Sequence, residues 1–238
     1  RLITNNFELH VTMANSVWMK QLLDIDLDID QATTLSMIVN DRAQQLMVDF
    51  HAPSFSYNGK QYTNADVYIT APSDTMYLRL SIDNPQENGH ALAFDIDGHA
   101  ANNELSLKLN WNNSNPEKLM NGELNVNGRL YKNFNNQPEA HIRVMPSDVQ
   151  IENSNWQIEP SDILYSTNRL LVDHFSVHND EQYITINGSA SDNKSDSLVV
   201  DLHNVEVAYI LDLVNFDAVT FSGKASGKAF LSSAFKDP

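Results

Sequence analysis

The chain has 238 residues, 42% of them hydrophobic, so it can bury a sizeable core and is not expected to be disordered. Its 31 acidic residues outnumber its 15 basic ones and give a formal net charge of −16, a sign that repels nucleic acid. It has no cysteine, which excludes disulfides, thiolate metal sites and a cysteine nucleophile.

The two ends of the chain show no targeting or membrane-spanning pattern. No apolar run approaches the roughly 20 residues that a spanning helix needs, and Arg1 leads almost at once into patterned sequence. We therefore expect the chain to be a piece of a longer protein, residues 1–238 forming a single segment of it. Residues 1–90 and 91–238 are an alternative division into successive strand-rich units.

Alternation of apolar and polar residues runs along the whole chain with the two-residue period of half-buried strands. One face of each such strand is apolar and the other polar, which is typical of antiparallel sheets. The alternation predicts strands, in chain order, around residues 25–29, 35–39, 46–50, 67–69, 76–82, 92–96, 105–111, 124–126, 142–144, 184–186 and 198–202.

Turns and helices interrupt this pattern in a few places. Four dipeptides have hairpin-turn chemistry: Asn58-Gly59, Asn88-Gly89, Asp97-Gly98 and Asn121-Gly122. Apolar residues at helical spacing behind a polar start predict short helices over residues 15–23 and 207–214.

Four alternating aspartates, Asp24, Asp26, Asp28 and Asp30, are the most tempting metal-binding pattern, because calcium favours clustered oxygens. The calcium-loop template then fails, since Ile29 and Leu35 occupy the places of its glycine and its closing glutamate. We interpret the run as a solvated strand face.

Other short patterns give no stronger sign of chemistry. His174 and His178 would lie about 13 Å apart along a strand, too far to share one metal. Residues 223–228 resemble a phosphate-binding loop only faintly and are better interpreted as a glycine-containing strand. No pattern singles out a pair of carboxylates, so we expect no catalytic residue, no metal and no cofactor.

Two stretches carry a more specific pattern of apolar, Asn and Gly positions. One is Pro53-Ser54-Phe55-Ser56-Tyr57-Asn58-Gly59-Lys60 with residues 62–75. The other starts at Trp156-Gln157-Ile158 and continues through residues 160, 172–175, 183–188, 198–204 and 221–223. Together they resemble the TamB (translocation and assembly module) family in its Bacteroidetes-type form, which is related to AsmA-like envelope proteins.

The resemblance implies a periplasmic segment of a Gram-negative envelope protein whose parent is anchored in the inner membrane. Members of the family have a long sheet folded lengthwise into a trough with an apolar lining. They are associated with phospholipid transport to the outer membrane and with outer-membrane protein assembly. The chain lacks the family's inner-membrane helix and its C-terminal signature region, so docking to an outer-membrane partner would fall to other parts of the parent.

The expected fold is therefore all-β: a long, curved, mostly antiparallel sheet forming a trough (a β-taco) with one or two short helices. A compact β-sandwich is the alternative, because one-faced strands fit both. The expected function is non-enzymatic shielding of phospholipid acyl chains in an apolar groove, with Trp111 and Trp156 at its margins. The predicted lining is Phe94, Ile96, Leu105, Leu107, Leu109, Leu124 and Val126.

Two alternatives remain open at this stage. The predicted lining residues would instead fill a closed core if they meet a second layer. The rival function is that of a secreted β-sandwich that binds glycan or protein through surface aromatics such as Tyr57, Tyr62 and Trp111.

Overall fold

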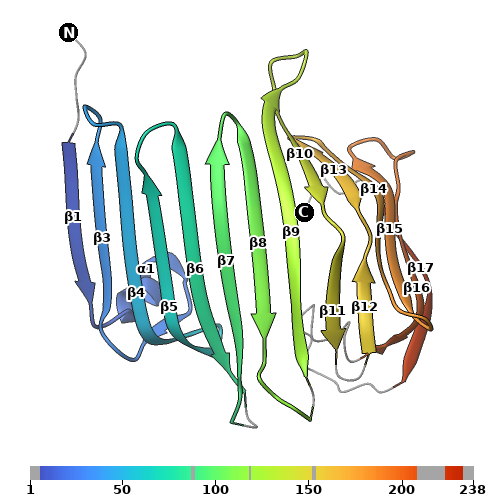
Figure 1. Ribbon diagram of the computed structural model, residues 1–238, viewed down its shortest axis with the longest axis horizontal. Helices are drawn as coiled ribbons and strands as arrows, with labels where there is room; N and C mark the ends of the chain where they lie inside the picture. The colour runs from blue at the N-terminus through green and yellow to red at the C-terminus, as the bar shows by residue number, and fades with distance from the viewer. Residues whose placement is uncertain (1–5, 87–88, 118, 152–153, 208–222, 233–238) are drawn as a thin grey trace. The chain divides into compact units, whose positions relative to one another are not determined.

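A computed structural model describes residues 6–86, 89–117, 119–151, 154–207 and 223–232 of the chain. The chain divides into two compact units, residues 1–123 and 124–238, and the boundary falls inside one strand, β9 (Met120–Lys132). The alternative division at residue 90 would instead separate β6 (Thr75–Pro85) from β7 (Ala91–Ala101), which pair along their whole length. Figure 1 shows consecutive strands in each unit, blue to green in the first and yellow-green to red in the second.

The predicted all-β class is confirmed. The seventeen strands of the described residues belong to one antiparallel sheet, and α1 (Val17–Leu23) is the one helix among them. In each unit the strands pair within that sheet, whereas a compact β-sandwich would place two sheets face to face.

The first unit is a sheet in which most neighbours in sequence are also neighbours in space. Its order is β1–β3–β4–β5–β6–β7–β8, and the short β2 lies beside the far end of β4. Besides β6 and β7, its strands are β1 (Asn6–Met13), β2 (Leu27–Ile29), β3 (Thr33–Asn40), β4 (Gln45–Tyr57), β5 (Lys60–Ala71) and β8 (Glu104–Asn112).

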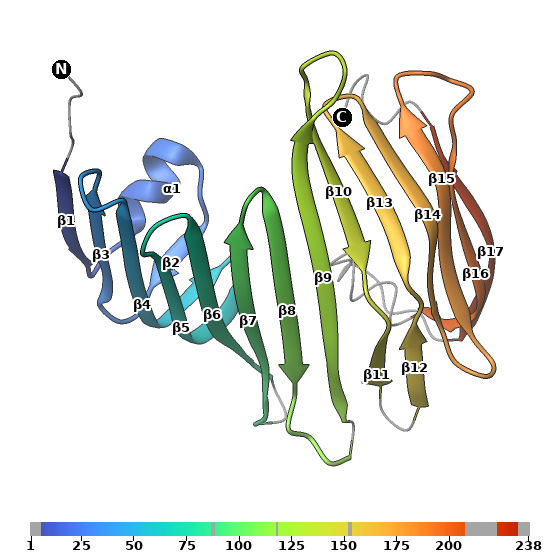
Figure 2. The same ribbon diagram turned by 45° about the horizontal axis from the view of Figure 1, so that its top comes forward.

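The second unit has the order β9–β10–β13–β14–β15–β16–β17. The hairpin β11–β12 joins it at both strands, because β11 pairs with β9 and β12 pairs with the end of β14. This part of the sheet is strongly curved, as the orange and red strands in Figure 2 show. Its strands are β10 (Pro138–Val144), β11 (Ser147–Ile151), β12 (Ser154–Ile158), β13 (Ser161–Ser166), β14 (Arg169–His178), β15 (Tyr183–Ser191), β16 (Leu198–Glu206) and β17 (Lys224–Leu231).

The predicted helix at residues 15–23 is present as α1, which packs beside β2. Asn15 Oδ1 accepts a hydrogen bond from the backbone N–H of Val17 (2.8 Å), and the helix ends at Asp24 in the left-handed conformation. The buried Ser16 accepts a hydrogen bond from the backbone N–H of Ile29, which ties the start of the helix to β2. The second predicted helix, residues 207–214, lies outside the described residues from position 208 onward.

The predicted turns have mixed outcomes. Asn58 and Gly59 connect β4 to β5 with φ of 48° and 75°, the backbone that a two-residue hairpin turn requires. Asp97-Gly98 and Asn121-Gly122 were wrongly predicted as turns, because they lie inside β7 and β9. At both positions the glycine makes room for side chains of the neighbouring strand, and neither has a positive φ.

Candidate functional site

The strand register of the first unit aligns its apolar residues into rows that cross the sheet. Two rows run unbroken through all seven long strands, because each residue lies opposite the next one in the neighbouring strand. The first row is Val11, Leu35, Phe50, Val67, Leu80, Ile96 and Leu109. The second row is Leu9, Met37, Val48, Ile69, Leu78, Gly98 and Leu107. We call the side of the sheet that carries these rows the apolar face.

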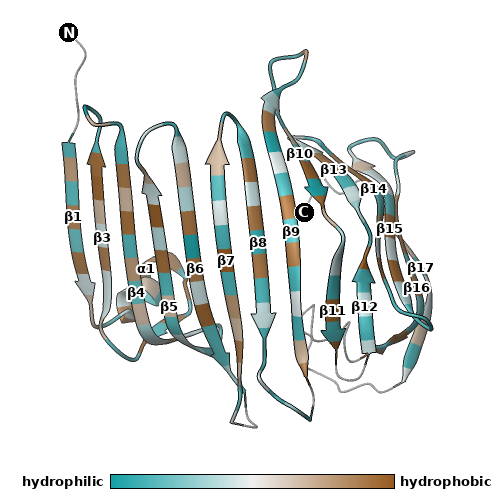
Figure 3. Ribbon diagram, in the orientation of Figure 1, coloured by the Kyte–Doolittle hydropathy of each residue, from teal (hydrophilic) through white to brown (hydrophobic). Residues whose placement is uncertain are grey.

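None of these positions is polar, and all fourteen are half-buried, neither fully covered nor fully exposed. A second layer packed over the rows would bury them, as it does in a protein core. The apolar face of the first unit is therefore partly open to solvent. Figure 3 shows brown residues alternating with paler or teal ones along the long strands β1 and β3 to β8, as a one-faced sheet requires.

Five of the seven residues predicted as lining lie on this face of β7 and β8: Phe94, Ile96, Leu105, Leu107 and Leu109. Ile96 faces Leu109, and Phe94 faces Trp111. The remaining two, Leu124 and Val126, belong to β9 in the second unit, where Val126 lies opposite the buried Val144. Leu124 and Val126 are both half-buried.

The rows extend well beyond the lining that the sequence pattern identified. Strands β1 and β3 to β6 contribute ten further row positions. The alternation of most of these segments is visible in the sequence. Only the register shows that they continue the same row as Ile96 and Leu109, because adjacent strands can be offset by any number of residues.

The second unit covers its apolar side more completely. Val172, Ala190 and Leu198 are 6%, 1% and 7% exposed and form a cluster against which Ile163 and Phe175 pack. Trp156, expected at the margin of a groove, is instead 2% exposed in β12. The closed-core alternative therefore describes this cluster of the second unit better than it describes the first.

The opposite face of the first unit is polar and is connected by ion pairs between strands. Arg79 Nε lies 3.3 Å from Asp97 Oδ1, and Lys108 Nζ lies 2.5 Å from Glu123 Oε2. These side chains are about half to four-fifths exposed, so each pair contributes little to stability. One side of the sheet in the first unit thus carries these charged side chains, and the other side carries the apolar rows.

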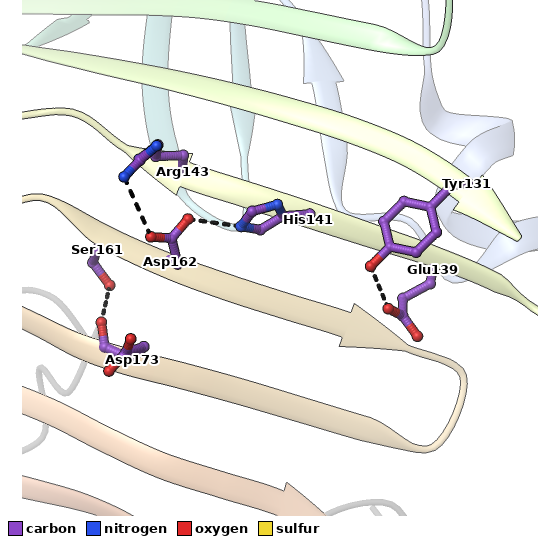
Figure 4. A network of polar contacts seen from close by, with 7 residues as sticks. All are labelled: Tyr131, Glu139, His141, Arg143, Ser161, Asp162 and Asp173. Atoms are coloured by element: carbon purple, nitrogen blue, oxygen red, sulfur yellow. Dashed lines mark hydrogen bonds and ion pairs between the residues drawn. The ribbon is translucent and has the colours of Figure 1, made fainter. Parts of the chain in front are cut away.

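The second unit has its own polar network on β9, β10, β13 and β14 (Figure 4). Asp162 accepts from His141 Nε2 at 2.6 Å and lies 3.7 Å from Arg143 Nη2. The phenol of Tyr131 donates to Glu139, and this hydrogen bond raises the pKa of Tyr131 above its usual value.

A histidine held by an aspartate can activate a nearby hydroxyl as a nucleophile, so the position of the Ser161 hydroxyl is informative. Ser161 Oγ donates to the backbone carbonyl of Asp173 at 2.8 Å, and the residue is 2% exposed. A buried hydroxyl engaged with the backbone is not placed as a nucleophile. The geometry supports cross-strand pairing rather than a catalytic arrangement.

The aspartate run does not form the single strand face that was expected. Asp24 ends the helix, Asp26 pairs with Lys20 at 2.5 Å, and Asp30 accepts hydrogen bonds from Ser54 and Gln61. Lys20 accordingly has a raised pKa, chiefly through its hydrogen bond to Asp26.

The two histidines of β14 are also separate. His174 lies against Asp173 and His178 against Glu159. No cluster of three or more candidate metal ligands is found in the part of the chain that the structure describes.

The three aromatics of the rival binding-module hypothesis do not form one exposed surface. Tyr62 stacks on Phe55 with a centroid distance of 5.4 Å and is half-buried. Trp111 is half-buried above Gly122, and only Tyr57, at 45%, is exposed. This arrangement gives no specific support to glycan binding at these residues.

No family model, curated protein or solved structure matches the chain. The resemblance to the TamB family therefore remains a hypothesis drawn from the sequence pattern. Among the helices of the described residues, none has the length and apolar character needed to span a bilayer.

Proposed function

We propose that this chain is a non-enzymatic segment that shields phospholipid acyl chains on the apolar face of its first unit. The observation that supports the proposal best is the pair of unbroken apolar rows, which cross seven strands while every member keeps partial exposure. In line with the resemblance, we place this activity in the periplasm of a Gram-negative cell. It would serve phospholipid transport between the inner and outer membranes or outer-membrane protein assembly.

The length of the rows suits a hydrocarbon chain. Seven strands are separated by six spacings of about 4.8 Å, so each row is about 29 Å long. The hydrocarbon core of a bilayer is about 30 Å thick, so one acyl chain occupies roughly half of that, about 15 Å. A single row is long enough for one chain with room for it to move along the row.

The expected strength of binding suits transfer better than storage. Full burial of an acyl chain of ordinary length is worth on the order of 10 kcal/mol at about 0.8 kcal/mol per methylene. A chain lying on a face that is open on one side buries about half of its surface, so we expect roughly 5 kcal/mol. This corresponds to a dissociation constant on the order of 0.1–1 mM for each chain, weak enough to permit sliding.

A photo-crosslinking pair tests the proposal. A benzophenone amino acid replaces Leu107 on the apolar face or, as the matched control, Lys108, whose neighbour on β7 is Asp97. The protein is incubated with vesicles of palmitoyl-oleoyl phosphatidylethanolamine, irradiated and analysed by mass spectrometry. We expect lipid adducts from position 107 at least tenfold more often than from position 108.

The same two variants in the intact parent protein in growing cells extend the test to the native setting. Adducts from position 108 but not 107 would reverse the assignment of the faces. If neither position yields adducts in vesicles or in cells, acyl chains do not occupy the apolar face and the proposal fails.

A further inference from the structure

The hairpin that joins β9 to β10, in the middle of the chain, ends in an exposed loop. The two strands pair from Val126↔Val144 to Lys132↔Pro138, and residues 133–137 connect them. Figures 1 and 2 both show this loop lying past the ends of β13 and β14, which belong to the same unit. The loop therefore stands clear of its own unit and can touch another surface.

The backbone of this loop is braced by hydrogen bonds of its own. Asn133 Oδ1 accepts from the backbone N–H groups of Asn135 and Gln137 at 3.0 and 3.1 Å. The N–H of Asn136 donates to the carbonyl of Asn133, and the N–H of Asn133 donates to the carbonyl of Gln137, both at 2.9 Å. A loop whose N–H groups are paired in this way can enter a region with little water at low cost.

Large apolar side chains lie at the tip of the hairpin and on both of its sides. Phe134 in the loop is fully exposed, at 111% the highest value among the exposed large hydrophobic residues of the described chain. Leu130 and Tyr131 at the end of β9 are 61% and 39% exposed, and adjacent strand residues point to opposite faces. Exposed apolar and aromatic side chains in such a group are typical of segments that enter the interfacial layer of a bilayer.

The charge near the tip is opposite in sign to that of the whole chain. Residues 129–138 contain the exposed Arg129 and Lys132 and no acidic residue, whereas the chain has a net charge of −16. The next carboxylate, Glu139, accepts a hydrogen bond from Tyr131 (Figure 4). At physiological salt the Debye length is about 8 Å, so acidic residues farther away are largely screened at the tip. Cations beside apolar side chains suit a layer where phosphates border hydrocarbon.

We propose that the tip of the β9–β10 hairpin inserts into the surface of a phospholipid bilayer. Phe134 reaches the acyl chains, while Arg129 and Lys132 lie at the level of the lipid phosphates. The contact is peripheral and reversible, because only a few side chains enter the bilayer. It does not depend on the function proposed for the first unit, since residues 129–138 belong to the second unit.

Vesicle flotation tests the role of Phe134. The chain is mixed with vesicles of palmitoyl-oleoyl phosphatidylcholine that contain about 20% phosphatidylglycerol, in about 0.15 M sodium chloride. Phe134→Ala should weaken binding about tenfold, because the inserted aromatic ring supplies most of the apolar contribution. The matched control is Phe230→Ala, which should leave binding unchanged, since Phe230 is 68% exposed in the same unit but lies on β17.

A charge reversal tests the basic residues of the tip. Lys132→Glu should weaken binding to the same vesicles about tenfold, because it turns attraction to lipid phosphates into repulsion. Lys224→Glu makes an equal charge change on β17 and should have little effect. On vesicles of phosphatidylcholine alone, the loss caused by Lys132→Glu should shrink, whereas the loss caused by Phe134→Ala should persist.

A fluorescent probe locates the contact on the chain. Because the chain has no cysteine, a nitrobenzoxadiazole label can be attached at Asn135→Cys in the loop or at Asp180→Cys between β14 and β15. The emission of this label becomes stronger and shifts to shorter wavelength when the label leaves water. We expect this change on addition of vesicles at position 135 and not at position 180.

Three results would overturn the proposal. It is wrong if the unaltered chain does not float with the vesicles, or if the label responds at position 180 and not at position 135. It is also wrong if Phe134→Ala leaves binding unchanged, because the contact would then lie elsewhere, for example at the exposed Trp18 of α1. Phe134 is fully exposed, so its replacement should not unfold the chain, and circular dichroism checks this.

Discussion

Gly122 lies beneath the indole ring of Trp111, and a Cβ atom at this position would come within 2.3 Å of Cζ2. The residue is therefore a glycine because of the ring above it and not because of its backbone angles. Gly98 is a milder case, since a Cβ there would meet Leu107 Cδ2 at 2.9 Å, the end of a flexible side chain.

We predict that Gly122→Ala destabilises the first unit by about 1–3 kcal/mol, because the rigid ring must move. Gly98→Ala should cost clearly less, since Leu107 can change its rotamer. The free energies are measured by urea unfolding.

A double-mutant cycle between Gly122 and Trp111 tests whether the cost of Gly122→Ala comes from packing against the ring. Trp111→Leu removes the obstacle, so the cost of Gly122→Ala should fall to near zero in the Trp111→Leu background. Equal costs in both backgrounds would show that the ring is not the reason for the glycine.

A dipeptide with turn chemistry does not always form a turn in this chain. Asn58-Gly59 forms a turn as predicted, whereas Asp97-Gly98 has similar turn chemistry and lies within a strand. The difference comes from Leu78 and Leu107, which occupy the space that a side chain at position 98 would need. Leu78 is 20 residues before Gly98 and Leu107 is nine residues after it, and both lie on other strands. The dipeptide alone therefore cannot reveal them.

Single strands look alike in both units, but the environment of their apolar sides differs. Leu80 in β6 belongs to the first row and is half-buried, whereas Leu198 in β16 is 7% exposed within the core cluster of the second unit. Their sequences show the same alternation. Whether an apolar side is open or covered depends on what packs against it, which the alternation does not encode.

This contrast makes a matched pair of substitutions informative. Leu198→Ala should destabilise β16 by about 2–5 kcal/mol, because it leaves a cavity in a packed cluster. Leu80→Ala should destabilise β6 by only about 1–2 kcal/mol, since part of the side chain is in water already. Amide hydrogen exchange of the two strands measures both values in the intact chain. Equal costs would mean that the first unit is as well covered as the second.

At the scale of the whole molecule, charge is the dominant feature. The formal net charge of −16 implies self-repulsion in the folded state, while the Lys and Arg ion pairs described above are exposed and individually weak. Repulsion should therefore outweigh the attractive pairs in the response to salt.

We predict that the melting temperature rises by a few degrees when sodium chloride is increased from 0.01 to 0.15 M, a change that shortens the Debye length from about 30 to about 8 Å. Differential scanning calorimetry measures the shift. Chloride is preferred to sulfate because sulfate stabilises proteins by exclusion from their surface. A melting temperature that falls with salt would show that local ion pairs dominate instead.

The sequence by itself determined the all-β class, the positions of most strands, the first helix and the polarity of each strand face. These depend on a two-residue period and on local turn chemistry, which act between near neighbours in the chain. The tertiary structure decided which apolar residues align into rows, that the rows extend to β1, and that Val172, Ala190 and Leu198 are covered while Ile96 and Leu109 stay half-buried. Those outcomes depend on register and on covering layers, because both arise from contacts between residues far apart in sequence.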